Sequence, residues 1–273
     1  MSPAKVNLFL NILSRDDQGY HDINSIFTHI DLNDEITISE SDKFNINFLG
    51  EFSKYIKHNN IEILFNFLIK KNLIKSDRYS IRITKNIPVG SGLGGGSRNI
   101  ATVLNFLKSR KLLRDDEAIY VAKKLGSDIE FFLDNKPAII TGRGNVFRRI
   151  EYFKSVYVLL VYPNIVLSTQ EVYESYKLSN FKNTFLTKAE KFELDKILGS
   201  TKNMLEKTAI DLCPDIKIII DELKSFYGAS YSRMTGSGSC CFTVFNEKDY
   251  AIKAMNIIKS NHSSWWTCVA RII

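Results

Sequence analysis

Residues 88–97 read PVGSGLGGGS, with five glycines in the seven positions 90–96. A strand-like segment precedes this stretch and a helix-like one follows it. Glycine reaches positive φ at little cost and lets a ligand approach the backbone. Glycines just before a helix can turn successive N–H groups toward one point, at the positive end of the helix dipole. The stretch therefore predicts a phosphate-binding loop.

Other interpretations of this loop fit the sequence less well. Gly90, Gly92 and Gly95 match the dinucleotide pattern G-x-G-x-x-G, but the acids that follow, at 115–117, open a predicted helix instead of ending a strand. A P-loop is excluded because no Gly-Lys-Ser/Thr follows. A mobile linker without a ligand is the remaining alternative, and the helix directly after the loop favours the phosphate site over it.

The composition is that of an ordinary globular protein, long enough for one large domain or two modest ones. Of its 273 residues, 44% are hydrophobic and 25% are charged. No apolar stretch reaches the length of a membrane span and no leader pattern opens the chain, so we expect a cytoplasmic protein that does not contact membranes. The net charge of +7 comes from scattered lysines, which favours a solvated surface over nucleic-acid binding. The four cysteines form no C-x-x-C pair, which argues against a protein-bound metal.

Apolar periodicity predicts a mixed α+β protein in two layers. Strands are predicted at 6–13, 34–39, 44–48, 79–85, 137–141, 156–162, 231–235, 240–245 and 265–271. Helices are predicted at 60–70, 97–108, 115–125, 169–176, 187–198, 214–227 and 247–259. Asn60 is the predicted N-cap of the first of these helices. A change of pattern after Tyr162 predicts two domains, 1–162 and 163–273.

Three further segments carry chemistry that complements the loop. Lys5 and Asn7 share one face of the first strand, Asp128 follows a helix that ends at Gly126, and Thr-Gly-Ser-Gly-Ser at 235–239 joins two strands. Taken singly, they predict a surface charge, a turn residue and a hairpin turn. Taken together, they permit transfer of a phosphoryl group to a hydroxyl. A carboxylate accepts the hydroxyl proton, and a lysine keeps that carboxylate ionised and offsets developing charge.

These segments, in this order and at these separations, resemble the signature motifs of the GHMP small-molecule kinase superfamily. The start of the chain, PAKVNLFL at 3–10 with GYH at 19–21 and IF at 26–27, is similar to members that act on a cytidine-diphosphate derivative of methylerythritol in the non-mevalonate route to isoprenoids. The resemblance covers essentially the whole chain. It implies an α+β fold of two domains: an N-terminal ATP-binding domain like domain 2 of ribosomal protein S5, and a ferredoxin-like C-terminal domain, with the active site between them.

The resemblance also implies a role for each motif residue. Asp128 would be the general base that deprotonates the 2-hydroxyl of the methylerythritol moiety, and Lys5 would pair with it. ATP would bring Mg²⁺ with it, the ion being held at most by a hydroxyl such as that of Ser97. The implied contacts of the ATP phosphates are Pro88, Val89, Gly90, Ser91, Gly92, Leu93, Gly94, Gly95, Gly96, Ser97 and Arg98. Asn60 and Lys85 would lie near the adenosine end of ATP.

The implied contacts of the cytidine substrate are Asn7, Tyr20, His21, Phe27 and Tyr173. His21, in a predicted loop, would hydrogen-bond the cytosine edge, and the rings of Tyr20 and Tyr173 would bracket the base. The expected partners are these two small molecules only, with no nucleic acid and no membrane, and the expected state is a monomer or a weak homodimer.

Three positions depart from the pattern that is usual in the superfamily. Arg98 stands where a small hydroxyl residue is common, so its guanidinium would contact phosphate or point to solvent. Glu130 stands where proline is common and would raise the pKa of Asp128 if the two faced each other. Tyr173 stands where phenylalanine is familiar. The alternatives are a GHMP kinase for another small alcohol such as homoserine or mevalonate, an S5-like RNA-binding module, and an inactive ATP-binding protein.

Overall fold

The computed structural model of the chain describes residues 1–151, 154–177 and 193–273, which form two compact units. The first unit comprises Met1–Ala4, Leu32–Val89 and Gly94–Asn135, and the second comprises Lys5–Asp31, Gly90–Leu93 and Lys136–Ile273. Two long strands, β1 (Ser2–Arg15) and β2 (His21–Glu40), and the glycine loop contribute residues to both. The bounds of these units do not coincide with the predicted domain boundary at residue 162. The division into domains 1–162 and 163–273 stays a prediction.

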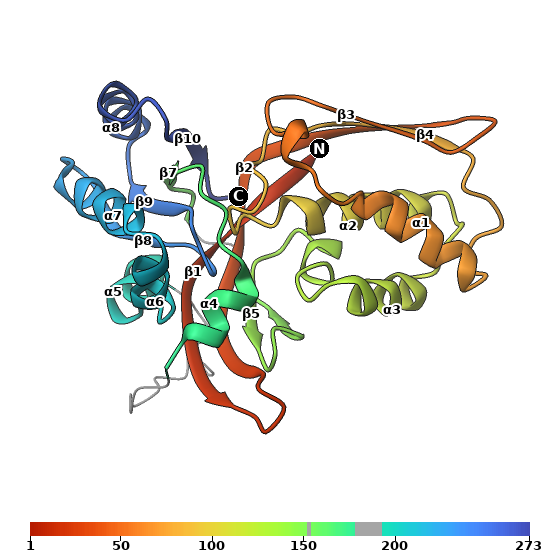
Figure 1. Cartoon of the computed structure of the whole chain (residues 1–273), viewed down its shortest axis with the longest axis horizontal. Helices are drawn as coiled ribbons and strands as arrows, with labels where there is room; N and C mark the ends of the chain where they lie inside the picture. The colour runs from red at the N-terminus through yellow and green to blue at the C-terminus, as the bar shows by residue number, and fades with distance from the viewer. Residues whose placement is uncertain (152–153, 178–192) are drawn as a thin grey trace. The chain divides into compact units, whose positions relative to one another are not determined.

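The first unit combines a small sheet with three helices. In the sheet, β4 (Tyr79–Thr84) pairs antiparallel with the second half of β2 and parallel with β3 (Asn45–Leu49). The helices α1 (Asn60–Lys70), α2 (Gly95–Ser109) and α3 (Asp115–Leu125) lie side by side, with α2 in contact with both others (Figure 1). The ring of Tyr79 in β4 contacts those of Phe65 in α1 and Phe106 in α2, so the helices pack on this sheet. Short 3-10 helices, η1 (Ser53–Tyr55) and η2 (Phe131–Leu133), complete the unit.

The second unit contains an antiparallel sheet in the order β10-β7-β9-β8. Its strands are β7 (Tyr157–Tyr162), β8 (Ser230–Met234), β9 (Cys241–Phe245) and β10 (Trp266–Arg271). The helix α7 (Asp215–Ser225) precedes β8, α8 (Lys248–Asn261) connects β9 to β10, and both helices contact the sheet. The chain thus runs β-α-β-β-α-β, the ferredoxin-like arrangement that was predicted. Its first strand is β7.

The remaining elements of the second unit surround the first half of β2 or precede α7. Residues 25–27 of β2 pair with β5 (Ala138–Thr141), which pairs in turn with β6 (Val146–Arg149). Three helices lie between β7 and α7 along the chain: α4 (Thr169–Ser175), α5 (Leu194–Ser200) and α6 (Glu206–Leu212).

Among the strands and α-helices of the described residues, the sequence prediction lacks the first half of β2, β6 and α6. Residues 23–30 of β2 are all buried, so no alternation of apolar and polar residues marks the strand. The predicted loop at His21 is accordingly wrong, because this residue opens β2. The other two elements, of four and seven residues, are too short for a clear period. Of the predicted helix at 187–198, residues 187–192 lie outside the described residues, and α5 covers the end.

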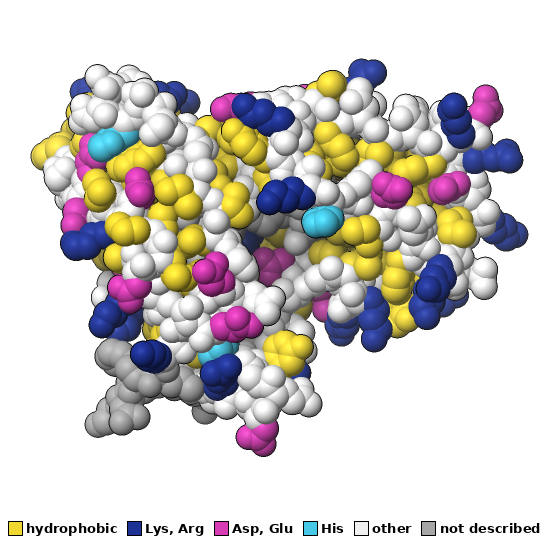
Figure 2. Space-filling model, in the orientation of Figure 1, with side chains coloured by type: hydrophobic (Ala, Val, Ile, Leu, Met, Phe, Trp, Pro, Cys, Tyr) yellow, Lys and Arg dark blue, Asp and Glu magenta, His cyan; other side chains and the backbone are white. Residues whose placement is uncertain are grey.

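Positively and negatively charged side chains are mixed on the surface. On the face shown in Figure 2, Lys and Arg side chains are interspersed with Asp and Glu and do not gather in one patch. Within the described residues, no helix has the length and apolar character needed to cross a bilayer.

Candidate active site

The predicted phosphate loop has a backbone that its glycines make accessible. Gly90, Gly92 and Gly94 have φ values of +73°, +81° and +75°, in a region that residues with a Cβ rarely adopt. Gly94 is the N-cap of α2, and the first helical hydrogen bond runs from the N–H of Arg98 to the Gly94 carbonyl (2.9 Å). The amides of residues 95–97 precede that bond. They have no acceptor within the helix and are therefore donors suited to an anion.

Asn60 and Lys85, both predicted to contact ATP, lie beside the first residues of α2 in the first unit. A Cβ added to Gly96 would lie 3.0 Å from Nδ2 of Asn60, and one added to Gly95 would lie 3.3 Å from Nζ of Lys85. The structure therefore places Asn60 and Lys85 beside the amides that the loop offers. It also shows how tightly the glycines are surrounded, because a side chain at Gly96 would displace the Asn60 amide.

Asn60 is not the N-cap of α1, contrary to the sequence prediction. The N-cap is Asn59, whose Oδ1 accepts from the N–H groups of Ile61 and Glu62 at 3.2 and 3.1 Å. Because Asn59 satisfies these helix donors, the amide of Asn60 does not cap α1 and lies against Gly96 instead.

The guanidinium of Arg98 is buried, so the interpretation that it points to solvent is wrong, whereas its contact with phosphate stays a prediction. Only 6% of the residue is exposed. Its Nη1 donates to the carbonyl of Phe132 at 2.5 Å, and its Nη2 donates to Oδ1 of Asn135 at 3.0 Å. Burial lowers the pKa of Arg98 to about 10, which leaves it charged at neutral pH. The side chain thus ties α2 to the segment that follows Asp128.

Asp128, the predicted base, lies in the turn between α3 and η2 and is half-buried. Its Oδ1 accepts a hydrogen bond from Oγ of Ser127 at 3.3 Å. The nearby Glu130 forms an ion pair with Lys123 of α3 at 3.8 Å, so a cation partly offsets the negative charge that this departure introduces. Asp128 belongs to the first unit and Lys5 to the second, and their pairing stays a prediction.

Lys5 and Asn7 share one face at the start of β1, as predicted. The ammonium of Lys5 donates to Oδ1 of Asn7 at 2.5 Å and lies 4.6 Å from the ring centroid of Phe27. The Asn7 amide is oriented by its Nδ2, which donates to Oγ of Ser25 at 3.1 Å. A buried ammonium requires such partners, because an uncompensated charge away from water is costly. Phe27, a predicted substrate contact, thus lies under the Lys5 ammonium.

Both glycine-rich segments meet these residues within the second unit. The N–H of Lys5 donates to the Leu93 carbonyl at 3.0 Å, and the N–H of Asn7 donates to Oγ1 of Thr235 at 2.8 Å. A Cβ added to Gly236 would lie 3.6 Å from Nζ of Lys5, and one added to Gly92 would lie 3.0 Å from the Gly238 carbonyl. Three segments far apart in sequence therefore meet around Lys5. The bond from Asn7 to Thr235 was not predicted, because the sequence analysis treats Thr235 only as part of a turn.

His21 and Tyr173, both predicted contacts of the cytosine base, lie against each other. Their ring centroids are 5.3 Å apart, and His21 also contacts the ring of Tyr176 at 6.0 Å. The Nε2 atom of His21 is buried and has no hydrogen-bond partner among the described residues. Buried polar atoms are normally paired, so this unpaired ring nitrogen is a candidate hydrogen-bonding group for a ligand.

Tyr20 is 57% exposed, and its ring faces the guanidinium of Arg143 at 4.4 Å. Arg143 lies in the turn between β5 and β6 and forms an ion pair with Asp16 at 2.5 Å. No sequence motif marks Arg143, so its place beside Tyr20 was not predicted. The bracketing of a base by Tyr20 stays a prediction.

His21 makes stability depend on pH. Burial lowers its pKa below the ordinary value of 6.5, the nearby Arg15 lowers it further, and Asp16 opposes them. The unfolded chain then binds a proton at His21 more readily than the folded protein, so this residue's contribution to stability is lost as pH falls below about 6.5. We expect the melting temperature to fall between pH 7.5 and 5.5, and to fall less in His21→Gln. Equal decreases in the two proteins, measured by thermal unfolding, would contradict this assignment.

Comparison with known proteins agrees with the motifs. A family model described as "GHMP kinases N terminal domain" matches residues 59–142, and one described as "GHMP kinases C terminal" matches residues 189–264. The chain is 32% identical over 277 aligned positions to 4-diphosphocytidyl-2-C-methyl-D-erythritol kinase of Anaplasma phagocytophilum, covering 100% of this chain and 93% of that protein. It is 33% identical over 278 positions to the Pelagibacter ubique protein of the same name, with 100% and 98% covered.

Solved structures confirm the fold. A 4-(cytidine 5'-diphospho)-2C-methyl-D-erythritol kinase superposes with a TM-score of 0.77 at 24% identity, covering 98% of this chain and 97% of the other. The mevalonate kinase of L. major superposes with a TM-score of 0.67 at 14% identity, covering 99% and 94%. The predicted two-domain kinase fold is therefore confirmed. By sequence, the chain belongs to the GHMP kinases and, among them, to the 4-diphosphocytidyl-2-C-methyl-D-erythritol kinase family.

Proposed function

We propose that this protein transfers the γ-phosphoryl group of ATP to the 2-hydroxyl of 4-diphosphocytidyl-2-C-methyl-D-erythritol, giving the 2-phosphate and ADP. This step belongs to the non-mevalonate synthesis of isoprenoid precursors. The observation that carries the proposal is the convergence of Lys5, Gly92 and Gly236 in the second unit, which unites three motifs of the kinase family. The relatives' names supply the acceptor. The cytoplasmic location and the monomeric or weakly dimeric state expected from the sequence are part of this proposal.

The chemistry assigns one proton transfer and one bond exchange to the site. Asp128 accepts the proton of the 2-hydroxyl as that oxygen forms a bond to the γ-phosphorus. The bond from the γ-phosphorus to the bridging oxygen breaks, and ADP leaves with the electron pair. The ammonium of Lys5, held by Asn7, offsets negative charge in the transition state. Phosphoryl transfer depends mainly on such positioning and charge stabilisation.

The start of α2 is the proposed site for the ATP phosphates. The amides of residues 95–97 donate toward phosphate oxygens, and Asn60 and Lys85 lie beside them. The donor set fits a nucleotide that brings its own Mg²⁺, because it offers N–H groups to phosphate and one hydroxyl, that of Ser97, to the cation. Bound Mg²⁺ supplies part of the charge neutralisation.

His21 is the proposed recognition group for the cytosine edge, through its unpaired Nε2. We expect His21→Ala to raise KM for the cytidine substrate by about tenfold or more, because a lost buried hydrogen bond costs about 1–3 kcal/mol. KM for ATP should change less than twofold. Initial rates at varied concentrations of each substrate measure both constants. His58→Ala, which removes an exposed histidine, is the control, and an unchanged KM in His21→Ala would refute the assignment.

The acceptor is tested by ADP release with Mg-ATP and three alcohols. We expect release with 4-diphosphocytidyl-2-C-methyl-D-erythritol and none above background with homoserine or mevalonate. Release with one of the other alcohols would replace the proposed substrate. ATP binding without release for any acceptor would favour the inactive alternative, and tight, salt-sensitive RNA binding without release would favour the RNA-binding one.

A further inference from the structure

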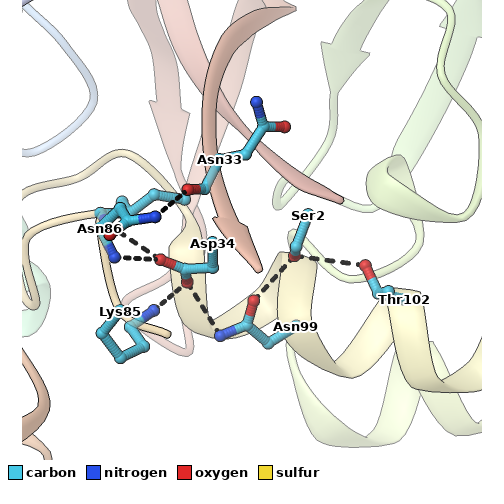
Figure 3. A network of polar contacts seen from close by, with 8 residues as sticks. Ser2, Asn33, Asp34, Lys85, Asn86, Asn99 and Thr102 are labelled. Atoms are coloured by element: carbon cyan, nitrogen blue, oxygen red, sulfur yellow. Dashed lines mark hydrogen bonds and ion pairs between the residues drawn. The ribbon is translucent and has the colours of Figure 1, made fainter. Parts of the chain in front are cut away.

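A buried polar network lies beneath the start of α2 in the first unit (Figure 3). At its centre is Asp34, which is fully buried in β2. Its Oδ1 accepts hydrogen bonds from the backbone N–H groups of Asn86 and Ile87, at 2.9 Å each. Its Oδ2 accepts from Nδ2 of Asn99 at 3.0 Å and from the ammonium of Lys85. One carboxylate thus satisfies four donors.

These donors come from the two sides of the glycine loop. Residues 85–87 lead directly into the loop at Pro88, whereas Asn99 lies in the second turn of α2, just after it. Asp34 belongs to neither segment and joins them from a third. The connection continues beyond Asn99, whose Oδ1 accepts from Oγ of Ser2 at 2.7 Å (Figure 3). Both ends of the loop are thereby anchored to β strands of the first unit.

The charges in this network balance within the protein. Lys85 is only 4% exposed and forms its ion pair with Asp34. A buried carboxylate with four donors, one of them cationic, is fully compensated, and removing either charged partner leaves the other charge uncompensated. The network therefore fixes the positions of the two ends of the loop and adds little net charge to the site. A Cβ added to Gly95 would lie 3.3 Å from Nζ of Lys85, so the ion pair lies directly against the first residue of α2.

We infer that Asp34 is a positioning residue for ATP, which presets the amides of residues 95–97 by fixing both ends of the loop. The inference rests on the proposed function, since it assumes that these amides bind ATP phosphates. A loop that is already ordered loses less conformational freedom when the ligand binds, and this difference appears as affinity. We call the contacts of Asp34 with residues 85–87 and with Asn99 the clamp. Loss of the clamp should therefore weaken ATP binding, while the binding of the cytidine substrate is preserved.

Two variants test the clamp, one by removing a hydrogen bond to Asp34 and the other by removing the charge of Asp34. Asn99→Ala removes the bond from α2 to Asp34 and the bond that Asn99 accepts from Ser2. Asp34→Asn keeps the shape of the side chain but removes its charge. We expect the dissociation constant of ATP, measured by calorimetry without acceptor, to rise about tenfold in Asn99→Ala, as for the lost buried hydrogen bond to Asp34. The rise in Asp34→Asn should be larger. KM for the cytidine substrate should stay within twofold in both.

Val121→Ala, which shortens a buried side chain of α3, is the control for general destabilisation. The inference is overturned if Asn99→Ala binds ATP as the wild type does, or if it weakens both substrates equally or matches Val121→Ala in its ATP affinity. If Asp34→Asn does not fold by circular dichroism, Asn99→Ala alone decides between these results. A wild-type protein that does not bind ATP would refute the proposed function, whereas wild-type binding with unchanged variants would refute only the clamp.

Discussion

Asp128→Asn is expected to lower turnover by about a hundredfold or more, because a positioned general base contributes about 10²–10⁴ to the rate. The amide has nearly the shape of the carboxylate but cannot accept the hydroxyl proton. ATP should bind with nearly wild-type affinity, since the proposed ATP contacts lie in the glycine loop, at Asn60 and at Lys85. The measurements are kcat from ADP release and the dissociation constant of ATP from calorimetry.

Asp134→Asn is the matched control for this variant. Asp134 is an exposed carboxylate that follows η2 in the same segment, and its loss should leave turnover near the wild-type value. Near-wild-type turnover in Asp128→Asn would remove Asp128 from the mechanism. A parallel loss of ATP affinity would instead mean that Asp128 supports the nucleotide site and not the proton transfer.

Lys5→Met is expected to have the second largest effect, again about a hundredfold on kcat, as for loss of one group that stabilises transition-state charge. Methionine keeps an apolar stem against the Phe27 ring but removes the ammonium that Asn7 holds. The substitution should therefore affect the chemical step far more than folding. Steady-state kcat and a thermal melt of the same sample separate the two effects.

Lys54→Met is the control for Lys5→Met, because Lys54 also lies over an aromatic ring, that of Tyr55 at 5.1 Å. Lys54 is exposed and outside the proposed site, so both kcat and melting temperature should be unchanged. If Lys5→Met lost stability and kept its turnover, the ammonium would be a structural group and the proposed role would fail.

Local spacing in the sequence was sufficient to predict several parts of the fold and site. The glycine loop, the shared face of Lys5 and Asn7, and the alternation of β4 each depend on residues that are close in the chain. Their conformations follow from glycine dihedrals and strand geometry, which act over a few residues. The first half of β2 was missed for a related reason, because burial on both faces removes the alternation that marks a strand.

Contacts between distant residues account for what the sequence did not predict. The guanidinium of Arg98 binds partners 34 and 37 positions later, and Asp34 binds Asn99 across 65 positions. No local pattern indicates such pairs. A buried arginine and a surface arginine have the same sequence context, and only the packing of η2 against α2 distinguishes them. The pairing of Arg143 with Tyr20 likewise depends on how the β5–β6 turn meets the β1–β2 hairpin.

The central claim, transfer of a phosphoryl group from ATP to one hydroxyl of this acceptor, is tested most directly by ³¹P NMR of the product. The wild-type protein is incubated with Mg-ATP and 4-diphosphocytidyl-2-C-methyl-D-erythritol. We predict one new phosphomonoester resonance without three-bond coupling to a proton, because the 2-carbon of the methylerythritol moiety carries a methyl group and no hydrogen, and this resonance should appear in step with ADP. ADP accumulation with no new phosphomonoester, or a phosphomonoester at another hydroxyl, would contradict the proposed reaction.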